Sequence, residues 1–246
     1  VAMDLAGPKL RTTQIESGRT GLSATRRDAN AHITLRPGDL LKVARDSVSG
    51  KAAIRDDAGN VVAPASIGVT LPPALAHAKP GQPIWFDDGK IGAVIDTADA
   101  DGLLVRITHA RESGSKLRAD KGINLPETYI ELPALSAKDL ADLEFAAINA
   151  DVISLSFVNC AEDVELIQRH LKRLGSSAGL VLKIETQSGF EQLPQILLTA
   201  MRSANFGVMI ARGDLAIECG FERLAEVQEE ILWLCEAAHV PVIWAT

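Results

Sequence analysis

The second half of the chain alternates short apolar runs with amphipathic segments, and this alternation constrains the fold more than any other feature. The apolar runs have the length of strands, and the first three are each followed by apolar residues at helical spacing. The runs lie at residues 152–158, 180–185, 206–211 and 240–246. Continuously apolar strands that alternate with helices favour parallel pairing, with both faces of the sheet covered. We therefore predict either a doubly wound sheet or a (β/α) barrel.

Helix signals precede the first of these strands and stand between the others. Ser136 and Asp139 are predicted to form a capping box, because the serine oxygen can accept a first-turn amide and the carboxylate suits the positive end of a helix. Leu140, Leu143 and Ala147 would then form the apolar stripe of that helix. Later helices are predicted on the same grounds at Val164, Ile167, Leu171 and Leu174, at residues 192–201, and at Leu224, Val227, Ile231 and Leu234.

Residues 9–126 follow a different pattern. Turn signals recur there, including Pro-Gly pairs within residues 36–39 and 79–82, and the apolar runs between them are short. Helical periodicity is almost absent. Because residues 1–4 resemble the end of one more buried strand, we predict that residues 9–126 form a small all-β domain inserted between a strand and its helix.

Composition narrows the class of protein. The net charge of -7 argues against a general nucleic-acid surface, and 4% aromatic residues leave few side chains for stacking on bases. The chain has no run of about eighteen apolar residues and no amino-terminal export signal, so we expect no membrane segment and a cytoplasmic location. Cys160, Cys219 and Cys235 are odd in number and unpatterned, which favours free thiols.

Polar side chains gather where the predicted strands end. In parallel α/β folds, ligands bind at the carboxyl ends of the strands. For any single residue, a bond to a loop amide or to a neighbouring charge explains the polar side chain at least as well as a functional role. Their shared position favours a common site. The residues are Asp4, Ser156, Lys183, Glu185, Arg212, Asp214 and Thr246.

The residue types at these strand ends indicate a chemistry. Glu185 and Asp214 offer the carboxylate oxygens that Mg²⁺ or Mn²⁺ prefers. Lys183 lies two residues before Glu185, so strand alternation places both on one face, where the ammonium could hold an oxyanion. Gly213 would let a carboxylate approach the backbone amides at the start of the next helix. For Arg212, a structural ion pair and a ligand contact both stay open.

Six segments, among them LKIE at 182–185 and MIARGD at 209–214, share their order and spacing with one known family. The other four segments lie at residues 3–12, 86–90, 121–126 and 241–246. On these motifs the chain resembles the central part of pyruvate kinases. The resemblance implies an α/β fold that is part of a (β/α)8 TIM barrel, with a small all-β barrel inserted as a lid domain. It assigns residues 1–8 and 127–246 to the barrel and residues 9–126 to the lid.

The resemblance also implies a reaction and roles for single residues. The reaction transfers a phosphoryl group between phosphoenolpyruvate and ADP, giving pyruvate and ATP through a metal-stabilised enolate. Glu185 and Asp214 match the ligands of the catalytic Mg²⁺ or Mn²⁺. Asp214 also matches a substrate-binding residue, together with Gly213 and Thr246. Lys183 matches the lysine that stabilises the enolate and the transferring phosphoryl group, and Thr246 matches a catalytic residue near the carbon that is protonated.

The inserted domain contributes basic residues under the same resemblance. Arg11 and Lys121 match groups that reach the nucleotide or the transferring phosphate, and Arg11 counts among the catalytic residues. Asp88 lies in the stretch that closes over the nucleotide, next to Asp87. Composition alone would favour solvated surface charges at Arg11 and Lys121, but the motif context outweighs that interpretation.

Three positions depart from the commoner family pattern: Leu5, which replaces a more usual threonine, Lys9 and Asn159. Lys9 stands where potassium-dependent members carry glutamate and potassium-independent members carry lysine. We therefore expect Lys9, with Asp4, to substitute for the monovalent cation, so that K⁺ is not required. Asn159 stands where arginine is common, which predicts the loss of an interface or phosphate contact. The family resemblance also predicts a homo-oligomer.

The first two barrel strands and the eighth strand of the family have no counterpart in the 246 residues. We therefore expect the barrel to need further sequence, and no kinase activity from the chain alone. Two other functions stay open. A metal-dependent pyruvate-enolate lyase or aldolase would use a similar barrel, although the nucleotide-binding motifs at 87–89 and 121–122 argue against it. The other is a catalytically weak pseudoenzyme that binds metabolites as a sensor.

Overall fold

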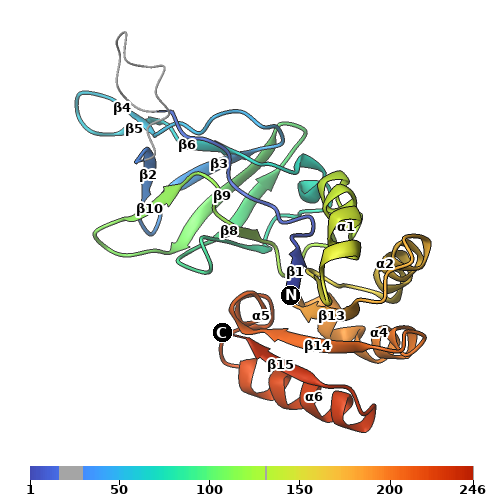
Figure 1. Ribbon diagram of the computed structural model, residues 1–246. Helices are drawn as coiled ribbons and strands as arrows, with labels where there is room; N and C mark the ends of the chain where they lie inside the picture. The colour runs from blue at the N-terminus through green and yellow to red at the C-terminus, as the bar shows by residue number, and fades with distance from the viewer. Residues whose placement is uncertain (17–29, 131, 246) are drawn as a thin grey trace. The chain divides into compact units, whose positions relative to one another are not determined.

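The computed structural model describes residues 1–16, 30–130 and 132–245. The chain divides into two compact units (Figure 1). Val1–Pro8 and Pro133–Thr246 form the first, here called the α/β unit, and Lys9–Leu132 form the second, the β unit. Each unit has a hydrophobic core of its own. No helix among the described residues combines the length and the apolar character that a bilayer span requires.

The α/β unit is built on one sheet of five parallel strands in the order β1-β12-β13-β14-β15. The strands are β1 (Ala2–Leu5), β12 (Val152–Leu155), β13 (Gly179–Ile184), β14 (Phe206–Ala211) and β15 (Val242–Ala245). Each strand pairs with the next one along the unit, and the order never reverses. A doubly wound sheet needs such a reversal, whereas a barrel does not. Of the two predicted architectures, the strand order therefore fits the barrel.

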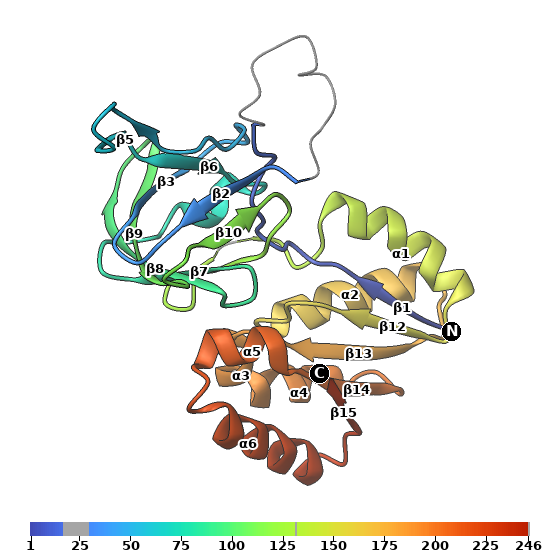
Figure 2. The same cartoon turned by 90° about the vertical axis from the view of Figure 1, so that its left-hand side faces the viewer.

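Helices cover one face of this sheet (Figure 2). The longer ones are α1 (Ala137–Asn149), α2 (Ala161–Arg173), α4 (Leu193–Ala200) and α6 (Leu224–Ala237). Two short helices, α3 (Gln187–Glu191) and α5 (Arg212–Cys219), directly follow the ends of β13 and β14. The strand ends are therefore joined to helices by very short connections, which fixes where their polar residues lie.

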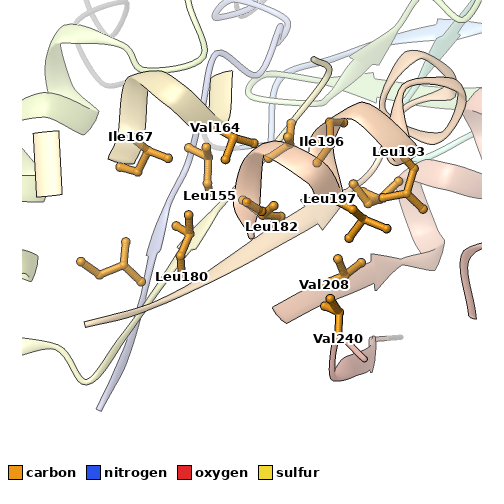
Figure 3. Close-up of a cluster of buried hydrophobic side chains, with 14 of the residues drawn as sticks. Leu155, Val164, Ile167, Leu180, Leu182, Leu193, Ile196, Leu197, Val208 and Val240 are labelled. Atoms are coloured by element: carbon orange, nitrogen blue, oxygen red, sulfur yellow. The ribbon is translucent and has the colours of Figure 1, made fainter. Parts of the chain in front are cut away.

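The core of the α/β unit lies between the sheet and its helices (Figure 3). Leu180 and Leu182 of β13 join Val164 and Ile167 of α2 in one buried cluster. Removing a side chain of this size from water stabilises the fold by roughly 1.5–3 kcal/mol. Because side chains alternate along a strand, Lys183 lies on the opposite face of the sheet. The apolar face anchors the strand, and the other face is free for polar groups.

The start of α1 follows the prediction, but its stripe does not. The capping box of Ser136 and Asp139 is present, with each side chain bonded to the other residue's backbone amide. Leu143 and Ala146 are buried, whereas Leu140 is exposed. Asp139 is also buried and accepts a hydrogen bond from the Gly7 amide at 3.3 Å. The buried side of the helix is therefore centred on the capping carboxylate, and the prediction for Leu140 is wrong.

The strand predicted at 152–158 is shorter in the structure. β12 ends at Leu155, and Phe157 has a φ of 54°, which a bulky side chain rarely adopts. Ser156 and Phe157 therefore leave the strand in a turn, although their residue types favour a strand. The apolar spans of α2 and α6 behave as predicted, because Val164, Ile167 and Ile231 are completely buried.

The β unit contains a mixed sheet of six strands in the order β11-β7-β8-β9-β3-β6. Two further pairs, β10-β2 and β4-β5, complete its sheets. The strands are β2 (His32–Leu35), β3 (Leu40–Ala44), β4 (Ile54–Arg55), β5 (Val61–Ala63), β6 (Ala65–Gly68), β7 (Pro83–Phe86), β8 (Ile91–Ala98), β9 (Gly102–His109), β10 (Ser115–Arg118) and β11 (Ile123–Asn124). One 3-10 turn, η1 (Pro72–Leu75), is the only helical element among the described residues of this unit.

Two predicted turns of the β unit contain glycine with positive φ, and the carboxyl-terminal end of the unit is held by Gln82. Gly38 and Gly81, in the two predicted Pro-Gly turns, have φ values of 88° and 91°, which favour glycine. The division between the units falls after Leu132, whereas the sequence places it after residue 126. Gln82 accounts for part of the difference, because its side chain bonds both the Glu127 carbonyl and the Thr128 hydroxyl.

Candidate functional site

Three polar side chains meet at the carboxyl ends of β12 and β13. The parallel register pairs Leu155 with Leu182, the residues just before Ser156 and Lys183, and strand alternation places Lys183 on the face away from the helices. Lys183 Nζ is 3.0 Å from Ser156 Oγ and 3.0 Å from Glu185 Oε1. The structure thus brings Lys183 and Glu185 together on one face, as strand alternation predicts. It adds Ser156 as a partner of the same ammonium.

This cluster is largely shielded from solvent. Glu185 and Ser156 are 3% and 4% exposed, and 16% of the Lys183 side chain is exposed. An ion pair in such a place is weak evidence for stability, because desolvating two charges can cost as much as their attraction gains. Titratable groups that are held in this way at a ligand-binding strand end are candidates for function. The remaining exposed part of Lys183 is where a ligand oxygen could approach.

The neighbouring strand end carries Gly213 and Asp214. Helix α5 follows β14 without a loop, and both residues lie in its first turn. Gly213 is exposed, and a Cβ built on it would meet no atom within 4 Å. Close packing of neighbouring atoms therefore does not explain why this position is a glycine. First-turn amides have no partner within their own helix and attract anions, so a ligand carboxylate could approach them here.

The carboxylates at these strand ends fit a hard divalent cation. Glu185 follows β13 and Asp214 follows β14, and these two strands are paired neighbours. Mg²⁺ takes one or two protein carboxylates and keeps its other positions for water and substrate oxygens. No group of three or more His, Cys, Asp or Glu residues in the described parts of the chain could hold a metal. The donor set is therefore sufficient for Mg²⁺ or Mn²⁺ only if a substrate or water supplies the remaining ligands.

Arg212 has a structural partner that the sequence did not indicate. Its Nε donates a hydrogen bond to the Ala245 carbonyl at 2.7 Å, and its guanidinium lies 5.7 Å from the centre of the Trp244 ring. Both contacts join the end of β14 to the end of β15. Neither the predicted ion pair nor a ligand contact is needed to account for this arginine.

A second cluster lies in the β unit around Asp87. Asp87 Oδ1 is 2.9 Å from Lys121 Nζ, and Oδ2 is 3.3 Å from Lys90 Nζ. Burial of Asp87 would raise its pKa, but the pairing with Lys121 and then Lys90 outweighs this and lowers the pKa below its ordinary value. The stability that this carboxylate contributes is therefore present above its unfolded pKa and is lost as the pH falls through the lower folded value.

Arg11 lies beside the same segment. It forms an isolated bridge with Gly122, and its side chain donates a hydrogen bond to the Asp120 carbonyl at 2.9 Å. The next residue, Thr12, accepts a hydrogen bond from the Lys121 amide at 2.9 Å. The β unit thus places Arg11 and Lys121 on adjacent segments.

Of the other predicted site residues, some belong to the β unit and some to the α/β unit. In the β unit, a Cβ built on Gly122 would lie 3.1 Å from Lys9 Cε and 3.8 Å from Asp88 Oδ1, so Lys9 and Asp88 flank this glycine. Asp88 is exposed, whereas Asp87 is buried. In the α/β unit, Asp4 is exposed on the edge strand β1. Thr246 lies outside the described residues.

The three cysteines are free thiols, as predicted. Burial raises the pKa of Cys160, Cys219 and Cys235 to about 11. We expect iodoacetamide to label them on the order of 100-fold more slowly than a free cysteine at neutral pH, because only the thiolate reacts. Mass spectrometry of the folded protein measures this rate. Labelling as fast as in the urea-unfolded protein would contradict the expectation.

Comparisons with known proteins agree with this architecture. A family model described as "Pyruvate kinase, barrel domain" matches residues 1–246. Pyruvate kinase PKLR of Rattus norvegicus is 31% identical over 100% of this chain and 38% of its own length. The pyruvate kinase of Schizosaccharomyces pombe is 38% identical over 68% of this chain and 32% of its own length. That of Mycobacterium tuberculosis is 29% identical over 100% of this chain and 45% of its own length. The chain spans less than half the length of these relatives, and it belongs to the pyruvate kinase family.

Proposed function

We propose that the chain carries the phosphotransferase site of a pyruvate kinase, which moves the phosphoryl group of phosphoenolpyruvate to ADP and gives pyruvate and ATP. The contact of Lys183 with both Ser156 and Glu185 at the strand ends supports this proposal most directly. It supplies a fixed positive charge beside a carboxylate at the edge of the sheet where ligands bind. The names of the relatives support the choice of substrates.

In the proposed reaction, Lys183 acts on the oxygens that gain negative charge. Its ammonium donates hydrogen bonds to the phosphoryl group in transit and to the enolate oxygen that is left behind. Glu185 and Asp214 would hold Mg²⁺ or Mn²⁺, which neutralises charge on the substrate oxygens. The amides beside Gly213 bind the substrate carboxylate. The enolate then takes a proton at carbon to become pyruvate, and the sequence motif assigns Thr246 to that step.

The β unit is proposed to bind the nucleotide. Arg11 and Lys121 supply positive charge for the phosphates of ADP, and Asp88 is exposed for a further contact. Asp87 holds Lys121 in place through the ion pair described above. This role for Asp87 was not assigned from the sequence, because the motif places two aspartates side by side and does not tell which one is buried.

The first test is formation of pyruvate from phosphoenolpyruvate and ADP by the protein at its natural length. We expect turnover that requires Mg²⁺ or Mn²⁺. Cleavage of an oxo acid without nucleotide would instead support the alternative function as a lyase or aldolase. Metal-dependent binding of phosphoenolpyruvate with no turnover would support the metabolite sensor. Sedimentation of the same sample tests the proposed homo-oligomer, and the cytoplasmic location stays a prediction from sequence.

Lys9 is proposed to replace a monovalent cation. We expect activity of the unaltered protein in buffers without K⁺, because the Lys9 ammonium supplies the same single positive charge. Lys9→Glu should lower the K⁺-free rate by about tenfold or more, and KCl should restore it. Lys79→Glu changes an exposed lysine of the same unit and is the matched control. Equal K⁺ responses in Lys9→Glu and Lys79→Glu would refute the role.

Gly213→Ala separates ligand approach from folding. The open space around Gly213 and its place in α5 predict unchanged or higher stability, by up to about 1 kcal/mol from helix propensity. A methyl group beside the first-turn amides should nevertheless raise the KM for phosphoenolpyruvate about tenfold, by the loss of roughly one hydrogen bond to a charged group. Thermal unfolding and steady-state kinetics measure the two effects. An unchanged KM would remove Gly213 from the proposed substrate site.

A further inference from the structure

Asn159 joins the two loops that carry the strand-end cluster, although the proposed chemistry does not use it. Its Oδ1 accepts a hydrogen bond from Thr186 Oγ1, in the loop after β13. Its Nδ2 donates to the Phe157 carbonyl at 3.0 Å, in the loop after β12. The Ser188 hydroxyl also donates to the Asn159 carbonyl at 3.4 Å. One amide side chain therefore bonds to both loops.

The two residues that the Asn159 side chain bonds are chain neighbours of cluster members. Phe157 directly follows Ser156, and Thr186 directly follows Glu185. The cluster itself depends on these two neighbours being correctly spaced, because Ser156 and Glu185 contact the Lys183 ammonium from different strands. A shift of about 1 Å at a strand end is enough to weaken a positioned catalytic group. A hydrogen-bonded link through Asn159 therefore lies next to both contacts of Lys183.

The loop after β12 is held in a conformation that needs support. Phe157 has a φ of 54°, and a left-handed backbone at a residue other than glycine costs on the order of 1 kcal/mol or more. The Asn159 side chain bonds the carbonyl of this residue. The backbone amide of Asn159 donates a hydrogen bond to Asp163 Oδ2 at 2.8 Å, which ties the asparagine to the first turn of α2.

Helix α3, which follows β13, packs closely against the same backbone. A Cβ built on Gly189 would lie 2.3 Å from the Val158 carbonyl oxygen, so no side chain fits there without a backbone shift. The Gly189 amide donates to Thr186 Oγ1 at 3.0 Å, which leaves the Thr186 hydroxyl proton for Asn159. The start of α3, the Thr186 hydroxyl and Asn159 therefore form one connected set of hydrogen bonds.

We propose that Asn159 is a positioning residue, which holds Phe157 and Thr186 and thereby sets the geometry of Ser156 and Glu185 around Lys183. This proposal deepens the proposed function, and its kinetic test rests on that function. The tests by metal binding and by hydrogen exchange do not depend on the proposed function. It also gives Asn159 a role inside the α/β unit, at a position where the sequence predicts only the loss of a contact.

Asn159→Ala is the main test, because it removes both side-chain bonds and leaves Thr186 to cap α3. We expect kcat to fall about 10-fold to 100-fold and Mn²⁺ affinity to fall about tenfold, as when other residues that orient metal ligands are removed. The KM for ADP should not change. Asn149→Ala is the matched control, because Asn149 also donates its side-chain amide to a carbonyl but lies exposed at the end of α1. Amide hydrogen exchange at residues 157–160 should accelerate only in Asn159→Ala.

The outcomes separate this proposal from the proposed function. If the unaltered protein binds Mn²⁺ without phosphoryl transfer, the proposed function fails and the Mn²⁺ affinities decide the role of Asn159. If a folded Asn159→Ala keeps kcat, Mn²⁺ affinity and hydrogen exchange within twofold of the unaltered protein, the positioning role is wrong. Should that variant not fold, Thr186→Val and Thr186→Ser replace it. The serine, which keeps the hydroxyl, should restore what the valine loses, and equal losses in both would overturn the proposal.

Discussion

Lys183→Met should lower phosphoryl transfer by on the order of 10³-fold, because it removes the donor that we propose acts on the oxygens that gain charge. Methionine keeps the length and the apolar stem of the side chain. The loss should therefore appear in kcat, with a smaller change in the KM for phosphoenolpyruvate. A coupled assay of pyruvate formation measures both. Lys172→Met, which alters an exposed lysine of α2, should leave both parameters unchanged.

The same substitution has a second expected effect, on stability. Glu185 would lose its lysine while it stays buried, and leaving one partner of a buried ion pair costs about 3–5 kcal/mol. Part of this loss should return when Mn²⁺ is added, because a cation bound at Glu185 would again balance the carboxylate. A kcat within tenfold of the unaltered enzyme, measured in a folded Lys183→Met sample, would exclude the catalytic role.

Glu185→Gln should greatly weaken the binding of the divalent metal. The amide has nearly the same shape as the carboxylate but lacks its charge, and a hard divalent cation binds a neutral amide much more weakly. We expect Mn²⁺ affinity to fall at least about 100-fold and turnover to fall with it. Isothermal titration with Mn²⁺ gives the affinity without any assay of activity. Comparable Mn²⁺ affinity in the variant and the unaltered protein would place the metal elsewhere.

A matched control keeps that result specific. Glu229→Gln removes the same charge from an exposed position on α6. It should leave Mn²⁺ affinity and turnover unchanged. Because Lys183 would lose its carboxylate partner in Glu185→Gln, thermal unfolding must accompany the titration. A stable variant that no longer binds Mn²⁺ is the outcome that identifies Glu185 as a ligand.

Strand periodicity is the part of the site that the sequence predicted best. Positions two apart on a strand share a face whatever surrounds them, so the pairing of Lys183 with Glu185 follows from their spacing alone. The contact of Ser156 with Lys183 depends in addition on the register between β12 and β13, which cannot be predicted from the apolar runs. The sequence therefore placed Ser156 among the polar residues at the strand ends, but it did not predict the contact of Ser156 with Lys183.

Helix faces and left-handed turns were harder to predict. The stripe of α1 is rotated because the capping carboxylate of Asp139 is itself buried, so Leu140 lies in solvent. Asp87 and Asp88 both have positive φ, and only the resulting backbone path decides which of them turns inward to Lys121. In each case a contact distant in sequence selects among local conformations that the residue types leave nearly equal.

The close approach of Gly189 to Val158 bears on how this sequence can diverge. With only 2.3 Å available to a Cβ, a change at position 189 requires a compensating change in the 157–159 backbone. Proteins that keep both loops in this arrangement should therefore keep glycine at this position, even where the surrounding residues of α3 vary freely. A natural variant with any other residue there is expected to have rebuilt the loop after β12, and with it the spacing around its strand-end lysine.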